Sequence, residues 1–241
     1  MIPKIIHQTW KSKTVPAHWK DYQISWIVNH PSYEYRLWTD EENRRFLEKH
    51  YPWFIETYDA LPESIMRADA MRPFYLYHYG GIYADLDYEC YQCMDNIIDY
   101  YSNDNYNVLL ARQMVGDRAS NYLMMSEAGH PFWLKVIDRM QKRVKRKWWQ
   151  TRMLYLWNAT GPNVINHVYA ENDWDDVLLL DDEHFNPQTP SIDKVMYGKH
   201  HETQSWGDDN SDRVLAVIHS LRKMKSYAES LLSESDSADS S

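Results

Sequence analysis

A chain of 241 residues, 44% of them hydrophobic, has enough apolar material for one large α/β domain or two small ones. Its formal net charge of −9 argues against nonspecific nucleic-acid binding, which needs a basic surface, so we expect no nucleic-acid partner. The 11 Trp and 19 Tyr stand beside only 7 Gly. Such rings offer flat apolar faces with a polar edge, as sugar and nucleobase sites need, although we expect most of them in the core.

Apolar periodicity and turn residues predict strands that alternate with helices in the first part of the chain. In chain order, the expected strands are residues 4–8, 33–38, 82–86, 107–112, 121–126 and 177–180. The expected helices are residues 20–29, 39–49, 63–79 and 131–147, with another starting after Thr160. Pro73 should kink or split the third of these helices. This order favours a mostly parallel sheet with helices on its faces.

The remaining segments set expectations about organisation and location. Residues 1–228 are expected to form a single domain, followed by an acidic, Ser-rich disordered tail over 229–241. Neither a signal peptide nor an apolar run of about 18 residues is found, so we expect a soluble protein of the cytoplasm, or of the host cytoplasm if the source is viral. Cys90 and Cys93 offer two thiolates where structural zinc wants four ligands, so we expect reduced thiols.

A basic run, KRVKRKWW, occupies residues 142–149. The favoured interpretation is the solvated face of the helix expected over residues 131–147. The alternative is peripheral contact with an anionic membrane or an anionic acceptor.

The segment most indicative of chemistry is Asp85-Leu86-Asp87, which follows a double glycine and an apolar strand. Side chains alternate along a strand, so the two carboxylates should project to one side, near a strand's carboxyl end, where ligands gather in open α/β sheets. Such a pair repels unless a cation lies between the two groups, and oxygen ligands select Mg²⁺ or Mn²⁺, ions that also bind a diphosphate. A second D-x-D at Asp173 lacks a preceding strand and is expected to be a solvated loop.

A second cluster lies one helix earlier, where Asp69 and Arg72 share a helix face. They would either pair with each other as an ion pair or point together at a polar ligand.

These segments resemble the DXD-containing sugar-transfer glycosyltransferases (family 32). The resemblance rests on IPKIIHQTW at the start, YEYRLWTD, and RADAMRPFYLYHYGGIYADLD over residues 67–87, and it runs to about Trp206. The motifs HQTW, YPWF, YHYGG, TGPN and HH…SW are most similar to the mannosyl inositol phosphorylceramide synthase and α-1,6-mannosyltransferase branch. The resemblance implies a GT-A-type, Rossmann-like, mixed and mostly parallel sheet flanked by helices.

The resemblance also implies a retaining, metal-dependent transfer of a hexose to a glycan or glycolipid acceptor. GDP-mannose is the favoured donor, with UDP-galactose or UDP-glucose as alternatives. Asp87 would bind Mn²⁺ or Mg²⁺ directly, Asp85 would touch the donor and a metal-bound water, and Asp69 with Arg72 would hold the transferring sugar.

The resemblance also implies roles for residues near the two ends of the matching segment. By resemblance, Gln8, Thr9 and Trp10 would lie by the nucleotide base. His201, Ser205 and Trp206 would close over the diphosphate. A histidine would also suit Mn²⁺ as an additional ligand. His201 is favoured as this ligand, and the choice between it and the adjacent His200 stays open.

Two rival functions are weighed against this one. Haloacid-dehalogenase-type phosphotransferases follow their D-x-D with a small Thr or Val, whereas Tyr88 and Glu89 follow it here. A noncatalytic sugar-binding module fits the aromatic content and the lack of a recognisable Ser-His-Asp motif. Turnover of a nucleotide sugar would separate the enzyme from the binding module. The oligomeric state is not indicated by the sequence.

Overall fold

The computed structural model describes residues 1–113, 117–186 and 195–201. The strands are β1 (Ile5–Thr9), β2 (Glu34–Trp38), β3 (Gly81–Ala84), β4 (Tyr88–Cys90), β5 (Val108–Arg112), β6 (Ala119–Ser126), β7 (Val177–Leu179) and β8 (Gly198–His200). The helices are α1 (Ala17–Asn29), α2 (Asp40–His50), the 3-10 helix η1 (Pro52–Phe54), α3 (Ile55–Asp59), α4 (Ser64–His78), α5 (Asp95–Asn103), α6 (Pro131–Gln141), α7 (Arg152–Ala159), α8 (Pro162–Ala170) and α9 (Asp182–Phe185).

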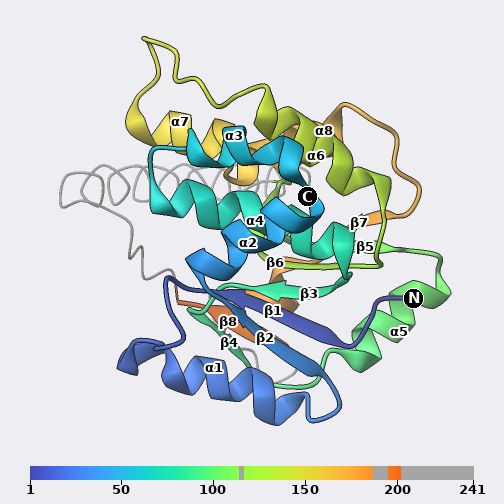
Figure 1. The fold of residues 1–241 in the computed structure, drawn as a ribbon. Coiled ribbons are helices and arrows are strands. Elements are labelled where there is room, and N and C mark those ends of the chain that lie inside the picture. Colours follow the sequence, from blue (N-terminus) through green and yellow to red (C-terminus); the bar gives the residue numbers. More distant parts are fainter. Residues whose placement is uncertain (114–116, 187–194, 202–241) are drawn as a thin grey trace, which may run out of the picture. The chain divides into compact units, whose positions relative to one another are not determined.

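A six-stranded mixed sheet organises these elements, in the order β2-β1-β3-β6-β5-β7. β1 runs parallel to both β2 and β3, and β5 runs parallel to β7, whereas β6 is antiparallel to its two neighbours. β4 and β8 form a separate antiparallel pair. Figure 1 shows α4, α6, α7 and α8 on one side of the large sheet and α1 on the other. The predicted α/β architecture is therefore confirmed.

Local signals in the sequence explain where several helices begin. Thr39 accepts a hydrogen bond from the backbone of Glu42, whose side chain bonds back to Thr39, so the capping box that opens α2 is present. Gly161 caps α8, and Pro162 is its first residue. α4 continues through Pro73 from Ser64 to His78, so the proline does not split this helix.

The double glycine between α4 and β3 is required by the backbone. Gly80 has φ +66° and Gly81 has φ +95°, both in the left-handed region that glycine occupies without strain. A Cβ on Gly81 would lie 2.4 Å from the carbonyl oxygen of Ile5. Glycine thus lets β3 approach β1 closely, and this approach positions the acidic segment that follows β3.

The expected helix over residues 131–147 is wrong in its length, and the expected domain boundary and tail lie outside the described residues. The helix expected over residues 131–147 ends at Gln141, so the basic run is not a helix face. Like charges at helical spacing within this run would repel each other, which disfavours continuing the helix. The described residues belong to one compact unit, Met1–Glu202. The boundary at 228 and the tail over 229–241 lie outside the described residues and stay predictions.

Within the described ranges, no helix is both long and apolar enough to cross a bilayer.

Candidate active site

The acidic segment forms a turn directly after β3. Asp85 donates its backbone N–H to the carbonyl oxygen of Tyr122 at 2.8 Å, and Tyr88 donates its own to the carbonyl of Asp85 at 3.1 Å. Leu86 is buried, whereas 21% of the Asp85 side chain and 14% of the Asp87 side chain are exposed. β3 ends at Ala84, so the carboxylates approach each other because the chain turns there and not because of strand alternation.

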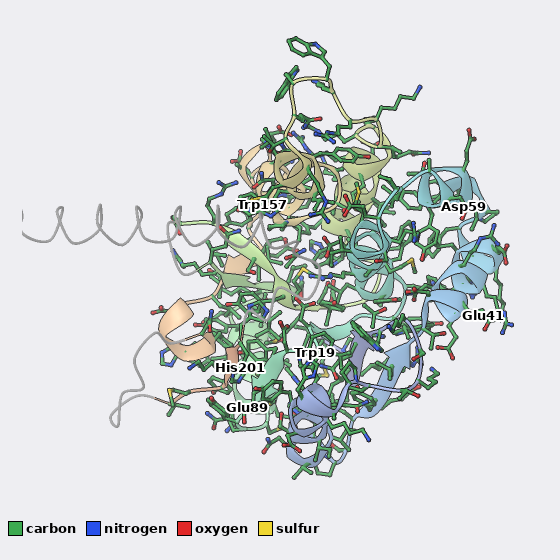
Figure 2. All side chains as sticks on the ribbon, turned by 90° about the vertical axis from the view of Figure 1, so that its left-hand side faces the viewer. Trp19, Glu41, Asp59, Glu89, Trp157 and His201 are labelled. Atoms are coloured by element: carbon green, nitrogen blue, oxygen red, sulfur yellow. The ribbon has the colours of Figure 1, made fainter. Side chains whose placement is uncertain are left out.

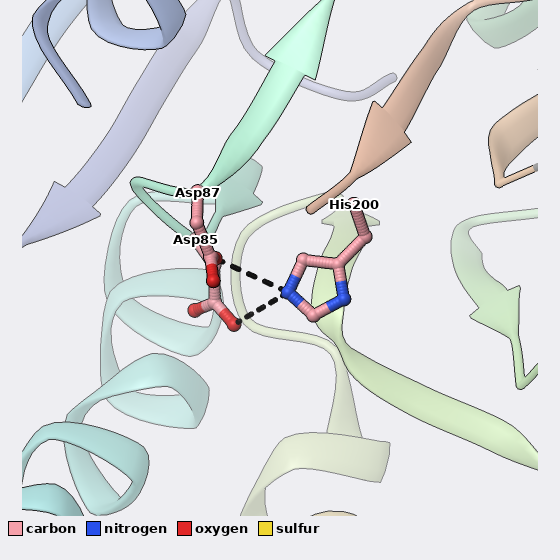
Figure 3. A group of neighbouring side chains, drawn as sticks. All are labelled: Asp85, Asp87 and His200. Atoms are coloured by element: carbon pink, nitrogen blue, oxygen red, sulfur yellow. Dashed lines mark hydrogen bonds and ion pairs between the residues drawn. The ribbon is translucent and has the colours of Figure 1, made fainter. Parts of the chain in front are cut away.

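His200 completes a cluster with the two aspartates. Its Nε2 lies 3.1 Å from Oδ1 of Asp87 and 3.9 Å from Oδ2 of Asp85. Each of the three residues offers one ligand atom, and these atoms all lie within 4.8 Å of one another (Figure 3). The imidazole stacks on the ring of Tyr122, with centroids 4.5 Å apart. The pairing of β8 with β4, in which His200 lies opposite Tyr88, brings this histidine to the turn.

The adjacent histidine lies elsewhere. Nε2 of His201 is 2.9 Å from Oε2 of Glu89, and its ring stacks on Tyr22 with centroids 4.3 Å apart. Figure 2 shows the side chains of His201 and Glu89 close together. Successive side chains along an extended segment point to opposite sides, so only one of two neighbouring histidines can face the carboxylates. His201 was the residue predicted from the sequence to bind the metal, whereas the structure brings His200 to Asp85 and Asp87.

Arg72 links the acidic turn to helix α4. Its Nη2 lies 2.6 Å from Oδ1 of Asp69 and 3.1 Å from Oδ1 of Asp85, and its Nη1 donates to the carbonyl oxygen of Asn121 at 2.7 Å. The guanidinium is buried, with 6% of the side chain exposed. Asp69 and Arg72 therefore pair with each other, which was one of the two alternatives, and Arg72 also reaches the D-x-D segment. That the two residues hold a common polar ligand stays a prediction.

Burial and neighbouring charges shift the pKa values of Asp69, Asp85 and Arg72. Burial raises the pKa of Asp69 to about 7, against the opposing effect of the Arg72 charge. Burial also raises the pKa of Asp85, and the neighbouring charges of Arg72 and His200 partly offset it. For Arg72, burial opposes the charged form, but Asp69 and Asp85 outweigh it and the pKa rises. Arg72 is therefore the fixed cation of the site.

Two further residues hold these carboxylates, and sequence reasoning missed both. Tyr83 donates its hydroxyl to Oδ1 of Asp85 at 2.7 Å, and Asn121 donates its side-chain amide to Oδ1 of Asp69 at 3.3 Å. Tyr83 stands two residues before Asp85, a spacing that could have revealed it. Asn121 was visible only as a polar residue in an expected strand.

The end of β1 lies at the same edge of the sheet as the end of β3, because these strands are parallel. Gln8 donates from Nε2 to the carbonyl oxygen of Asp85 at 3.1 Å and so supports the acidic turn. Thr9 donates its hydroxyl to the carbonyl of Trp38 at 3.2 Å. Trp10 packs against the cluster formed by Val15, Trp19 and Leu86, and its indole N–H is buried without a partner among the described residues. Trp10 therefore retains a hydrogen-bond donor next to the site.

The remaining residues singled out in the sequence lie away from this cluster or outside the described residues. Ser205 and Trp206 lie outside the described residues. Asp173 and Asp175 are exposed in the connection between α8 and β7, as expected for a solvated copy of the motif. Cys90 and Cys93 are free thiols, and burial raises the pKa of Cys90 to about 12.

Comparisons with known proteins point to one family. The family described as "Glycosyltransferase sugar-binding region containing DXD motif" matches residues 16–104. Inositol phosphoceramide mannosyltransferase 2 of Schizosaccharomyces pombe is 42% identical over 71% of this chain and 47% of its own length. Inositol phosphoceramide mannosyltransferase 3 of the same yeast is 35% identical over 90% of this chain and 59% of its own length. The chain thus spans about half the length of these curated relatives.

A solved structure supports the fold. The structure titled "PaToxG Glycosyltransferase" matches with a TM-score of 0.55 at 15% identity, covering 70% of this chain and 69% of that one. At this identity the likeness concerns the fold, and it agrees with the GT-A-type arrangement expected from the sequence.

Proposed function

Because this chain belongs to the DXD-containing sugar-transfer glycosyltransferases, we propose that it transfers a hexose from a nucleotide diphosphate in a metal-dependent, retaining reaction. The observation that carries this proposal is the convergence of Asp85, Asp87 and His200 at the end of β3. Retention rests on the family resemblance.

The three side chains suit a divalent cation. Carboxylate oxygens match Mg²⁺ and Mn²⁺, and the imidazole nitrogen favours Mn²⁺, since Mg²⁺ keeps oxygen ligands and water. Asp85 commits Oδ1 to Arg72 and Tyr83, while its Oδ2 is the oxygen nearer His200. We assign Asp87, Asp85 and His200 to the metal, and a bound ion would stabilise negative charge on the departing diphosphate.

Arg72 and Asp69 are assigned to the transferring sugar. The ion pair from Arg72 to both aspartates holds the guanidinium in place before any ligand arrives, which lowers the cost of ordering it on binding. A hydroxyl of the sugar would form hydrogen bonds with the donor and acceptor positions that Arg72 and Asp69 do not use in pairing with each other. Gln8, Thr9 and Trp10 are assigned to the side of the nucleotide base, and the indole N–H of Trp10, which has no partner within the described ranges, is the donor offered there. Ser205 and Trp206 remain assigned to the diphosphate by resemblance.

The names of the relatives guide the choice of substrates. They are inositol phosphoceramide mannosyltransferases, so mannose is the favoured hexose, GDP-mannose the favoured donor, and an inositol-bearing glycolipid the favoured acceptor. UDP-galactose and UDP-glucose are the alternatives to test beside it. A thermal-shift series with GDP and UDP, each with and without Mn²⁺, should show the largest stabilisation for GDP with Mn²⁺, because a ligand that binds only the folded state stabilises it.

The decisive experiment replaces one carboxylate without changing its size. Asp87→Asn should keep the fold and lower donor turnover about 100-fold, since a metal supplies several kcal/mol of charge stabilisation. Asp173→Asn, in the exposed copy of the motif, is the matched control and should turn over donor like the wild type. Wild-type turnover by purified Asp87→Asn would remove the metal assignment. A protein that binds the sugar nucleotide but never cleaves it would instead be a noncatalytic sugar-binding module.

A further inference from the structure

The connection between α6 and α7 carries a turn with two tryptophans at its tip. Gln150 donates its backbone N–H to the carbonyl oxygen of Lys147 at 3.0 Å, which makes Trp148 and Trp149 the central residues of a β-turn. Trp148 is 95% exposed and Trp149 is 54% exposed. Burying an aromatic side chain of this size is a large source of stabilisation, so leaving both in water indicates another environment for them.

This turn, residues 147–150, is braced by hydrogen bonds. The buried side chain of Gln150 accepts the backbone N–H of Lys147 at 2.8 Å. Arg146 donates from Nε and Nη2 to the carbonyl oxygen of Gln150 at 3.0 and 2.7 Å. Tyr155, on α7, donates its hydroxyl to the carbonyl of Val144. The exposure of the two indoles is therefore a property of an ordered loop.

The turn is surrounded by positive charge. Residues 142–149 contain five cations and no acidic residue, although the whole chain carries a net charge of −9. Lys142 forms an ion pair with Asp138 at 2.6 Å. The other cations of the run have no acidic partner in the described part of the chain; they are Arg143, Lys145, Arg146 and Lys147. Nζ of Lys147 also lies 5.6 Å from the ring centroid of Trp149. Aromatic and cationic groups are thus combined at one projecting tip.

We propose that residues 142–149 dock the protein onto the surface of an anionic lipid membrane. Indole rings settle at the headgroup level of a bilayer, where the apolar body and the N–H both find a suitable environment. Lysine and arginine beside them are attracted by anionic lipid headgroups. Figure 1 shows the α6–α7 loop projecting beyond the helices, a shape that meets a flat surface. The proposal goes beyond the transfer reaction, because it requires neither donor nor metal nor acceptor.

Co-sedimentation of the full chain with lipid vesicles tests this docking. The protein should bind vesicles of phosphatidylcholine with phosphatidylserine more tightly than phosphatidylcholine alone, and salt should weaken the binding. Lys145→Gln with Lys147→Gln should lower partitioning onto the anionic vesicles about 30-fold, because each cation near such a surface contributes about 1 kcal/mol. Trp148→Ala with Trp149→Ala should lower partitioning about tenfold or more.

Matched substitutions elsewhere on the surface serve as controls. Trp53 is 50% exposed and Lys20 is exposed on α1, so Trp53→Ala and Lys20→Gln should bind vesicles like the wild type. All replaced side chains are exposed, and an unchanged Tm checks that every variant folds. The proposal is overturned if the wild type does not bind anionic vesicles. It is also overturned if the double lysine variant and the double tryptophan variant bind these vesicles as tightly as the wild type. Tighter binding of a polyglutamate peptide than of vesicles would also overturn it, by assigning the loop to an acidic protein.

Discussion

His7 should control how the stability of the fold depends on pH. Its ring is fully buried, Nε2 lies 2.9 Å from the carbonyl oxygen of Gly80, and Nδ1 accepts the indole N–H of Trp38 at 3.1 Å. This arrangement requires a neutral ring with its proton on Nε2, because a proton on Nδ1 would face the indole N–H. Burial accordingly lowers the pKa of His7 from 6.5 to about 4. The contact to Gly80 links this residue to the turn that precedes β3.

The direction and size of the effect follow from these two pKa values. The unfolded chain, with the higher pKa, binds the proton first, so the stabilisation is complete above pH 6.5 and is lost as the pH falls toward 4. Lowering the pH from about 7.5 to about 5 should reduce the free energy of unfolding by about 2 kcal/mol through His7 alone. Most carboxylates remain ionised in that window.

Urea unfolding at both pH values, for the wild type and His7→Gln, measures this contribution. The variant should be less stable at neutral pH, but its stability should fall by about 2 kcal/mol less on acidification. Other buried histidines, such as His30, titrate in both proteins and cancel in the comparison. His18→Gln, at an exposed histidine, is the control. If His7→Gln kept the full pH dependence of the wild type, the assignment of the buried neutral ring would be refuted.

Four further predictions concern the site. Arg72→Ala should lower the free energy of unfolding by about 3–5 kcal/mol, because it leaves Asp69 and Asp85 buried without their cation. Arg72→Lys, which keeps the charge, should weaken binding of the sugar nucleotide more than that of the free diphosphate in calorimetry, and equal losses would count against the sugar assignment. His200→Ala should raise the Mn²⁺ concentration for half-maximal turnover about tenfold or more, whereas His201→Ala should not; the opposite pattern would restore His201 as the ligand. Chelation of divalent ions should abolish turnover until Mn²⁺ is added back. Unchanged turnover in the presence of the chelator would contradict the metal requirement.

Local signals predicted the elements well where short-range chemistry decides them. The capping box at Thr39 and the Gly161-Pro162 start of α8 were readable because each signal acts within a few residues. The helix expected over residues 131–147 ended at Gln141, although Val144 and Trp148 continue its apolar spacing, because the cations that follow repel one another at helical spacing. β4 and β8 were not predicted, since three-residue strands carry almost no periodicity and form only by pairing with each other.

The sequence by itself determined that Asp85 and Asp87 follow a strand entered through a double glycine, because backbone sterics and residue spacing are local. Only the tertiary structure decided which side chains meet them. Arg72 reaches Asp85 across the packing of α4 on β3, and His200 reaches Asp87 from 113 residues away. In the second case the outcome depends on the register of β8 against β4, and a shift of one residue would present a different side chain. Contacts of this kind are set by the packing of the whole domain, which no short stretch of the chain encodes.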